Sequence, residues 1–478
     1  MANVDVLVVG AGPNGLSAAI AAARAGCSVL VLEAQSTAGG GARTESLTLP
    51  GFLHDFGSAV HPFAALSPFF RTLPLERFGL TWVHPEIPLA HPLPDKTAAV
   101  LLRSMDETAA GLGVDAASYA RHMRAPMETL AWVTEELPQG RMPRHPASVV
   151  RWAAASLLPA SAIARRWFET TNARALIAGL AAHSALPLDW RGTGALALVL
   201  AAAAHLMGWP FPRGGAQQIT SALLACLCEH GGEVETDCTV RSLADLPPAK
   251  MVFWDLTPQQ LLSILGDAVP AAYRRALARY RYGPGACKVD WALSDPIPWL
   301  AADCRKAGTI HLGGSFEEIA RSEAEVWHGT LPRQPYVLLS QPSLFDPTRA
   351  PLGRHTAWAY CHVPNGCAIS MADAIETQVE RFAPGFRELI LARSEHTAPQ
   401  LEARDANLVG GDVTGGLHDL KQLLFRPTAR WHAMPLAGHY ICSSSTPPGG
   451  GVHGMCGYLA AKRALRSKVT LRRDNSGE

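Results

Sequence analysis

Residues 4–33, with the sequence VDVLVVGAGPNGLSAAIAAARAGCSVLVLE, decide the fold. The apolar run Val6–Val9 is typical of a parallel strand that is buried on both faces. A glycine-rich turn follows, and the alanine-rich stretch Leu16–Ala25 then favours a helix with Gly26 at its C-terminal end. Ser28–Leu32 predicts a second buried strand. The segment therefore predicts a β-α-β unit and, with it, an α/β fold built on a parallel sheet.

The turn in this unit is GAGPNG, the G-x-G-x-x-G pattern of dinucleotide-binding folds. Gly10 permits the tight turn, Gly12 lets the backbone approach a pyrophosphate, and Gly15 lets the helix pack against the strand. The helix N-terminus directs free N–H groups and a positive dipole end at the phosphates. Glu33 ends the second strand, 18 residues beyond Gly15, where a carboxylate accepts hydrogen bonds from ribose hydroxyls. The predicted cofactor contacts in this unit are Gly10, Gly12, Pro13, Asn14, Gly15, Glu33 and Ala34.

The composition excludes several classes of protein. Of the 478 residues, 17% are charged and 48% hydrophobic, which excludes a disordered chain. A net charge of +1 gives no sign of the basic surface that nucleic-acid binding needs. Ten cysteines without a C-x-x-C motif are too sparse for a disulfide framework, and no paired Cys–His spacing indicates a metal site. We therefore expect neither a nucleic-acid partner nor a bound metal.

Targeting signals are also missing from the sequence. The first apolar run is followed at once by the glycine-rich turn, unlike the long apolar region and small-residue cleavage site of a signal peptide. The longest apolar stretch, Gly194–Met207, has 14 residues, whereas a membrane-spanning helix needs about 20. This stretch has three interpretations: a channel lining for an apolar substrate, a helix that dips into a membrane surface, or part of the core. We expect a cytoplasmic protein, with peripheral membrane contact left open.

Three further stretches extend the pattern to the rest of the chain. AGGGART (38–44) follows the second strand, and FLHDFGS (52–58) comes next. Near the other end, HYICSSSTPPGGGVHGMCGYLAA (439–461) has the form of a strand, a glycine-rich turn and a helix that starts near Val452. These stretches resemble motifs of the FAD-binding amine-oxidase and phytoene-desaturase superfamily, although Ser443–Ser444 departs from the usual glycine.

The resemblance implies an FAD that is held non-covalently by both ends of the chain. Arg43 is suited to neutralise phosphate charge, and the dipole of the C-terminal helix would stabilise a reduced flavin. Backbone atoms of Val240, in a predicted strand pair over 231–240, would hold the adenine. No cysteine precedes Arg426 where some amine oxidases link their flavin covalently. The further cofactor contacts implied by the resemblance are Gly40, Gly41, Ala42, Arg43, Gly57, Ser58, Val240, Ser444, Gly450, Gly451 and Val452.

Three later stretches point to one branch of the superfamily. They are GTIHLGGS (308–315), PSLFDPTRAPLGRHT (342–356), and GGD (410–412) followed by LFRP (424–427). They are similar to the phytoene-desaturase-like and carotenoid-isomerase-like oxidoreductases, in the branch of pyridine nucleotide-disulfide oxidoreductase domain-containing protein 2. No second G-x-G-x-x-G follows a strand, so the sequence shows no built-in NAD(P) domain.

The resemblance also implies an architecture. We expect an α/β fold with a Rossmann-type, glutathione-reductase-like FAD-binding domain and an interleaved α+β substrate domain. The FAD-binding domain is expected to be discontinuous, over residues 1–95, 205–260 and 405–478. The substrate-binding domain would then comprise residues 96–204 and 261–404.

Four residues are candidates for catalysis. In amine-oxidase relatives a lysine that matches Lys288 contacts flavin N5 through water; the alternative is a solvent-facing lysine on a strand. Arg426 lies in the stretch that relatives place on the substrate side of the flavin, or else forms a buried ion pair. His61 and His453 could each exchange a proton near neutral pH, or make a structural hydrogen bond. The carboxylate of Asp55 is expected to fix its loop rather than to catalyse.

The sequence therefore predicts an FAD-dependent oxidoreductase that desaturates, saturates or isomerises carbon–carbon bonds of an apolar, polyene-like or other natural-product substrate. The hydride would pass to or from flavin N5. The electron acceptor, whether oxygen, a quinone or NAD(P), stays open, as does the oligomeric state. One alternative is a flavin amine or C–N oxidase, favoured by Lys288. An alternative of another class is a redox-silent FAD-binding interaction protein.

Overall fold

The apolar run at the start of the chain forms β1 (Val4–Val9), the central strand of a five-stranded sheet. The computed structural model describes residues 4–474; residues 1–3 and 475–478, the ends of the predicted FAD-binding domain, lie outside the described residues. The strand order is β16-β10-β1-β2-β9, and all four pairings are parallel. The other strands are β2 (Val29–Leu32), β9 (Glu233–Glu235), β10 (Ala249–Trp254) and β16 (His439–Ile441). The Rossmann-like α/β fold is confirmed.

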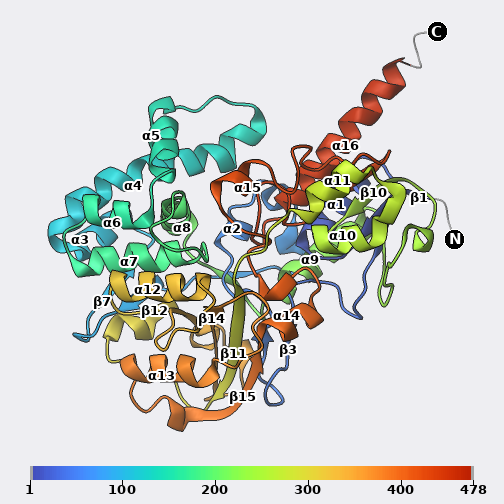
Figure 1. The fold of residues 1–478 in the computed structure, drawn as a ribbon. Helices are drawn as coiled ribbons and strands as arrows, with labels where there is room; N and C mark the ends of the chain where they lie inside the picture. Colours follow the sequence, from blue (N-terminus) through green and yellow to red (C-terminus); the bar gives the residue numbers. More distant parts are fainter. Residues whose placement is uncertain (1–3, 475–478) are drawn as a thin grey trace.

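Helices cover both faces of this sheet (Figure 1). On one face, side chains of three helices share a core with Val6 and Val8. Those helices are α1 (Pro13–Arg24), α9 (Gln217–Glu229) and α16 (Met455–Asp474). On the other face, Leu7 and Val9 pack against α10 (Pro258–Leu265) and α11 (Ala271–Ala278). Since the chain runs from β1 to β2 on one side and β10 to β16 on the other, the carboxyl ends of β1 and β10 form the switch point where such sheets bind ligands.

A second sheet has seven strands in the order β15-β11-β14-β13-β12-β6-β7. Its strands are antiparallel except for the parallel pair β12–β6. They are β6 (Ile87–Pro92), β7 (Ala98–Leu101), β11 (Gly285–Leu293), β12 (Ala307–Leu312), β13 (Val337–Ser340), β14 (His355–Val363) and β15 (Ile390–His396). One face packs on α13 (Ala372–Phe382), and α12 (Phe316–Trp327) lies on the other side of the sheet.

The remaining helices form a bundle beside the second sheet and short connections near the switch point. The bundle helices are α3 (Met105–Gly111), α4 (Ala116–Ala131), α5 (Pro146–Ser156), α6 (Ala160–Trp167), α7 (Thr171–Ala182) and α8 (Thr193–Met207). The short helices are α2 (Pro62–Ala65), α14 (Ala398–Arg404) and α15 (Leu420–Leu424). Two small antiparallel sheets of two strands pair β3 (Thr44–Glu45) with β4 (His54–Asp55) and β5 (Trp82–Val83) with β8 (Phe211–Pro212).

The apolar stretch 194–207 forms α8, and it lies in the core of the bundle. Most of its side chains are buried among α4, α5 and α7, so the membrane-dipping interpretation of this helix was wrong. His205 accordingly bonds the Tyr119 hydroxyl at 2.8 Å. Among the described residues no single helix has the length and hydropathy to cross a bilayer; α5 and α6 pass such a test only as a pair, bent by 113°.

Sheet membership differs from the predicted division of the chain at two places. Ile87–Pro92 pairs within the second sheet, although the predicted FAD-binding domain extends to residue 95. The helices over 258–278 pack on the first sheet, although residues 261–404 were expected in the substrate domain. The predicted strand pair over 231–240 contains one strand, Glu233–Glu235, because the segment after it bonds back to the Glu33 and Gln35 carbonyls instead of pairing with itself.

Candidate functional site

The turn after β1 has the geometry that the G-x-G-x-x-G pattern predicts. Gly10 adopts φ 101°, in the left-handed region that favours glycine. A Cβ atom on Gly15 would lie 2.0 Å from the Gly10 carbonyl oxygen, so helix and strand meet backbone to backbone. Because α1 begins at Pro13, beside Asn14, the positive end of its dipole lies at the switch point.

Two other predicted segments approach this turn. A Cβ on Gly40 would lie 3.3 Å from the Cα of Gly12, and a Cβ on Gly57 would lie 2.3 Å from the Gly41 carbonyl oxygen. The backbones of three segments that are distant in sequence therefore converge, and side chains would fill the space between them. This cradle fits a pyrophosphate, which needs backbone approach without a Cβ in the way.

Sequence reasoning missed a carboxyl group at the centre of the cradle. Asp255 follows the carboxyl end of β10, and its Oδ2 accepts a hydrogen bond from Gly15 N at 2.8 Å. Burial, helped by the charges of Asp405 and Glu33, raises the pKa of Asp255 to about 8 against the opposing Gly15 hydrogen bond. At neutral pH the Asp255 carboxyl is therefore protonated and adds no negative charge beside the phosphate position.

Glu33 and Arg43 both interact electrostatically with Asp405 beside the cradle. Glu33 accepts hydrogen bonds from Ala11 N at 2.7 Å and from Gln35 N at 2.9 Å, which orients its buried carboxylate. Asp405 lies near Gly40, with its Oδ2 3.9 Å from a Cβ placed there. Burial raises the pKa of Asp405, and the nearby Arg43 guanidinium lowers it. Arg43 brings positive charge to this acidic site, although its Nε also lies 3.6 Å from Glu45 Oε1, which shares that charge.

The C-terminal glycine-rich turn lies against the start of α1. A Cβ on Gly457 would lie 1.8 Å from the Asn14 carbonyl oxygen, so α16 and α1 are in backbone contact. α16 begins at Met455 rather than near Val452, because Gly451 and Gly454 adopt positive φ and keep the chain in a turn.

His453 caps this helix. Its Nδ1 accepts a hydrogen bond from Met455 N at 3.0 Å, and burial lowers its pKa to about 4, so the ring is neutral. The structural interpretation of His453 therefore fits the geometry better than a proton-transfer role.

Arg426 is a fully buried guanidinium without a carboxylate partner. Its Nη2 donates to the Tyr280 hydroxyl and the Ser444 carbonyl, each at 3.0 Å, and to the Gly415 carbonyl. Its Nη1 has no partner among the described residues and lies 3.1 Å from a Cβ placed on Gly449. The ion-pair interpretation was therefore wrong, because no Asp or Glu in the described part of the chain pairs with Arg426. An unpaired buried cation is costly, so this turn fits an electron-rich group.

Replacing Arg426 with Gln is expected to lower FAD affinity about 10- to 100-fold, since a charge-assisted hydrogen bond is worth about 1.5–3 kcal/mol. Fluorescence titration of the deflavinated protein with FAD measures this change. The exposed Arg279→Gln variant is the control and should leave the affinity unchanged. An unchanged affinity in Arg426→Gln would show that the guanidinium serves only to hold the loop carbonyls.

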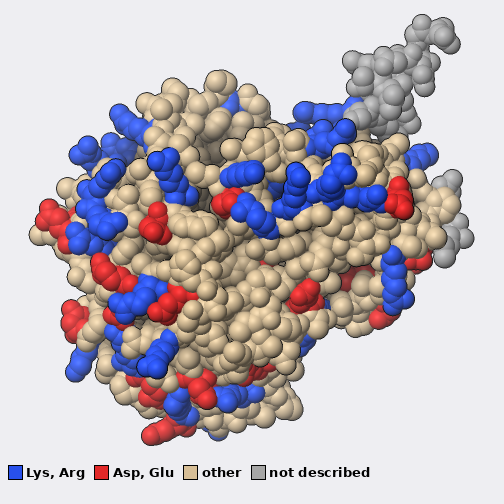
Figure 2. All heavy atoms as spheres, in the orientation of Figure 1, with Lys and Arg blue, Asp and Glu red and all other residues tan. Residues whose placement is uncertain are grey.

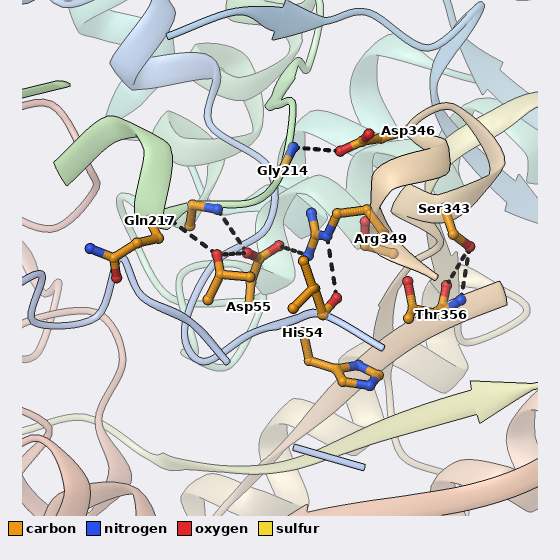
Figure 3. A network of polar contacts seen from close by, with 12 residues as sticks. His54, Asp55, Gly214, Gln217, Ser343, Asp346, Arg349 and Thr356 are labelled. Atoms are coloured by element: carbon orange, nitrogen blue, oxygen red, sulfur yellow. Dashed lines mark hydrogen bonds and ion pairs between the residues drawn. The ribbon is translucent and has the colours of Figure 1, made fainter. Parts of the chain in front are cut away.

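A buried ion pair ties the cradle to the second sheet (Figure 3). Arg349 Nη2 donates to Asp55 Oδ2 at 2.7 Å, and neither side chain is exposed. Asp55 Oδ1 accepts from Thr44 Oγ1 and Ala216 N, each at 2.8 Å, and Asp346 beside Arg349 accepts from Gly214 N at 2.6 Å. Although burial raises the pKa of Asp55, Arg349 and these hydrogen bonds bring it below its ordinary value. Asp55 thus fixes its loop, as predicted.

His61 is buried with both ring nitrogens unpartnered by the described residues. Burial lowers its pKa to about 4, so it is a neutral donor and acceptor at physiological pH. Just before it, Ala59 and Val60 pack on Trp358 of the second sheet. Phe63, just after it, lies 3.3 Å from a Cβ placed on Gly451. The segment that carries His61 therefore joins the C-terminal turn to the sheet.

Lys288 is buried on this same face of the second sheet, so the solvent-facing alternative was wrong. Its Nζ is ion-paired with Asp290, two residues along β11, and lies 5.7 Å from the centre of the Trp358 ring. His54 Nδ1 lies 3.7 Å from the other Asp290 oxygen, and burial lowers the pKa of His54 to about 3, which leaves it neutral. The charge of Lys288 is therefore balanced within the sheet.

The other predicted cofactor residues are placed around these features but make no contact that tests their roles. Ala34 and Ser58 are exposed, and Ser58 Oγ donates to the Val60 carbonyl at 2.9 Å. Thr220 donates to the buried Ala42 carbonyl at 2.8 Å. Val240 is half-buried against the core beneath β10. Half-buried positions also include Ser444, Gly450 and Val452.

Comparisons with known proteins agree with this geometry. A family model described as an NAD(P)-binding Rossmann-like domain matches residues 8–73. Pyridine nucleotide-disulfide oxidoreductase domain-containing protein 2 of Rattus norvegicus is 25% identical over 97% of this chain and 93% of its own length. One of the proteins that make up limonene dehydrogenase in Castellaniella defragrans is 32% identical over 22% of this chain and 19% of its own.

Among solved structures, putrescine oxidase bound to putrescine superposes with a TM-score of 0.64 at 16% identity, covering 98% of this chain and 99% of the oxidase. At 16% identity, the similarity to putrescine oxidase shows that the two proteins share a fold. The chain therefore has homologues that are named as oxidoreductase-domain proteins, and its fold is a Rossmann-like NAD(P)/FAD-binding fold.

Proposed function

We propose that this protein is an FAD-dependent oxidoreductase that desaturates, saturates or isomerises carbon–carbon bonds of an apolar substrate. The observation that carries the cofactor assignment is the convergence of the Gly12 turn, the Gly40–Gly41 segment and the C-terminal turn on one site with an unpaired Arg426. The first two would hold the pyrophosphate, and Arg426 suits the electron-rich pyrimidine edge of a reduced flavin. When bound, FAD would supply hydride transfer at N5.

The face of the second sheet beside His61 supports an apolar substrate. Leu338 and Trp358 form a buried apolar cluster with Val60 on this face, and Lys288 beside it is ion-paired with Asp290. An apolar environment of this kind favours an apolar substrate beside it, because such a substrate brings no charge that needs a partner. Lys288 would then polarise or orient a proton carrier at the flavin rather than bind the substrate.

One observation favours the alternative, an amine oxidase. Glu323 is buried, its Oε2 is bonded by His362 Nδ1 at 2.8 Å, and its Oε1 has no partner among the described residues. The aromatic rings of Tyr336 and Tyr360 lie 6.2 and 5.6 Å from the His362 ring. A free carboxylate oxygen among aromatic rings is what a substrate ammonium requires.

An anaerobic visible spectrum tests the proposal. We expect the purified protein to show a flavin spectrum, and heat denaturation to release the flavin as free FAD. NADPH, limonene, a linear polyene and putrescine are then added separately, and bleaching identifies the reductant. Bleaching by limonene or the polyene supports the carbon–carbon assignment, and bleaching by NADPH supports a reductive or isomerising enzyme. A protein that binds no FAD, or a flavin that none of the four reduces, would contradict the proposal.

The Glu323→Gln variant separates the two functions. If the protein oxidises amines, this variant is expected to lower kcat/KM for putrescine about 10- to 100-fold, because the ammonium loses its charged partner. If the substrate is an apolar hydrocarbon, turnover of limonene should change little. Stopped-flow flavin reduction measures both rates, and the exposed Glu317→Gln variant on the same helix is the matched control. Equal loss with both substrates would mean that Glu323 only supports the fold.

A further inference from the structure

A knob of exposed apolar side chains projects from the helical bundle at α5, at the top of Figure 1. We define this α5 knob as residues 137–158. Met142 is 83% exposed and Val150 69%, and Leu137 and Leu157 are also about half exposed or more. α5 buries only Ser148 among its 11 residues. Small and apolar residues recur along its exposed face, so one apolar stripe faces solvent. These residues are Ala147, Val150, Ala154 and Leu157.

The base of the α5 knob contains a pocket lined by three arginines. The pocket has a volume of about 380 Å³ and lies between α4 and α5. Arg121 and Arg124 stand one turn apart on α4, and Arg151 faces them from α5. None of the three guanidiniums makes a hydrogen bond or an ion pair with any described residue. Three cations around one pocket repel one another, and the repulsion is relieved when an anion binds between them.

Two of the three nearby carboxylates are paired with other arginines, and the third is bonded by a serine that lines the pocket. Glu135 pairs with Arg71 at 3.3 Å and Glu136 with Arg144 at 2.7 Å. Glu128, one turn beyond Arg124, accepts a hydrogen bond from Ser148 at 2.5 Å. Residues 116–158 hold five Arg and three Glu, a net charge of +2 with His neutral. Glu128 offsets part of the charge of the pocket, and the net positive charge that remains is available to a ligand from outside the chain.

We propose that the α5 knob docks the protein on an anionic phospholipid bilayer, with the three arginines around a lipid phosphate and the apolar stripe at the acyl boundary. Figure 2 shows the knob largely free of charge at its tip, with Lys and Arg around its flank. This is the pattern of a helix that lies in the membrane interface. α5 has 11 residues and is too short to cross a bilayer, which needs about 20.

A second copy of this chain fits the knob less well. Most protein homodimers are symmetric and place the same patch of each copy face to face. Such a contact would bring the three-arginine pocket of one copy against that of the other, and like charges would oppose it. A bilayer with anionic headgroups instead supplies both an apolar phase and the opposite charge. Docking is independent of the proposed redox chemistry, and its test needs no substrate.

Vesicle co-sedimentation of the full chain tests the proposal. We expect binding to vesicles of phosphatidylcholine with phosphatidylglycerol, and little binding to phosphatidylcholine alone. Binding should weaken as salt rises, because salt screens the arginines. Each basic residue near an anionic surface raises the partition coefficient about fivefold to tenfold. Removing three guanidiniums should therefore lower that coefficient roughly a hundredfold. That variant carries Arg121→Gln, Arg124→Gln and Arg151→Gln. A second variant carries Met142→Ser, Val150→Ser and Leu157→Ser, which removes exposed apolar side chains of the knob. This variant should lower the partition coefficient at least about tenfold.

Matched controls lie on other faces of the protein. The apolar control carries Leu352→Ser, Ile369→Ser and Leu391→Ser, which are also exposed. The charge control carries Arg275→Gln, Arg279→Gln and Arg333→Gln, which are exposed or half-buried at the surface. Neither control should alter vesicle binding. The variant with Arg121→Lys, Arg124→Lys and Arg151→Lys should preserve most of the binding, because the charge remains. Thermal unfolding midpoints verify that every variant is folded.

Three outcomes would overturn the proposal. In the first, the wild-type chain fails to bind the anionic vesicles. In the second, the knob variants bind them as well as the controls do. In the third, sedimentation shows a concentration-dependent dimer that the knob variants abolish while vesicle binding is unaffected, which would assign the knob to self-association.

Discussion

Replacing Asp55 with Ala is expected to lower the free energy of unfolding by about 3–5 kcal/mol, the usual cost of removing one partner of a buried ion pair. The loss is large because Arg349 would keep its charge with no exposure to water, bonded only to the Leu53 carbonyl. The Thr44 hydroxyl and Ala216 N–H would lose their acceptor as well. Urea denaturation followed by circular dichroism measures the change.

The same pair predicts acid sensitivity. The pKa of Asp55 is lower in the folded chain than in the unfolded one, so its stabilisation is complete above the unfolded value of about 3.8. That stabilisation is lost as the pH falls through the lower folded value. The Asp55→Ala variant should therefore show a shallower loss of stability below pH about 4.

An exposed ion pair provides the control for this variant. Lys306 and Glu86 lie 3.0 Å apart with both side chains more than half exposed, and Glu86→Ala should cost less than about 1 kcal/mol. A double variant, Asp55→Leu with Arg349→Met, should recover part of the loss because no unpaired charge stays buried. If Asp55→Ala costs no more than Glu86→Ala, the pair does not hold the two sheets together.

Replacing Asp255 with Asn is expected to remove most of the fall in stability that the wild-type chain shows as the pH rises from about 4 to about 8. The folded chain raises the pKa of this carboxyl from 3.8 to about 8, chiefly by burial. A raised pKa means that its contribution is complete below about 4 and is lost as the pH rises through about 8. Since Asn stays neutral, the variant should be more stable than the wild type at pH 9, by an amount on the order of several kcal/mol.

FAD binding should follow the same pattern, since ionised Asp255 would repel a pyrophosphate in the cradle. We expect wild-type affinity to decline above pH about 8 and the Asn variant to retain it. Fluorescence titrations at several pH values measure the affinity, and thermal melts of the FAD-free chain measure stability. The exposed Asp303→Asn variant is the control. If the Asp255→Asn variant loses stability and FAD affinity with rising pH as the wild type does, the titrating group is Asp405, whose pKa is also raised by burial.

Local sequence patterns predicted the parts of the molecule that local geometry determines. The β-α-β unit and the close approach at Gly15 follow from residues within one segment. The ion pair of Lys288 with Asp290 also follows from alternation along a strand, since residues two apart share a face. That signal was in the sequence, and it would have placed an acidic partner beside the candidate lysine.

The contacts that determine charge at the site join residues too distant in sequence for such patterns. Gly15 and Asp255 are 240 residues apart, and Asp55 and Arg349 are 294 apart. A weak signal existed for Asp255, because it follows an apolar strand as Gly10 does, and the ends of adjacent parallel strands meet at one edge. Nothing in the sequence indicated that Arg426 would lack a carboxylate partner, since absence of a partner is a property of the whole fold.

The contact between α1 and α16 has a consequence for how the chain is made. α1 begins at Pro13 and α16 at Met455, so the part of the apolar face of α1 that α16 covers stays uncovered until this much later segment has been made. No residue larger than glycine fits at position 457, since a Cβ there would lie 1.8 Å from the Asn14 carbonyl oxygen. A chain that is released early, before this helix, would display unpaired apolar surface and be open to aggregation or degradation. Completion of the nucleotide-binding half therefore depends on the late synthesis of α16.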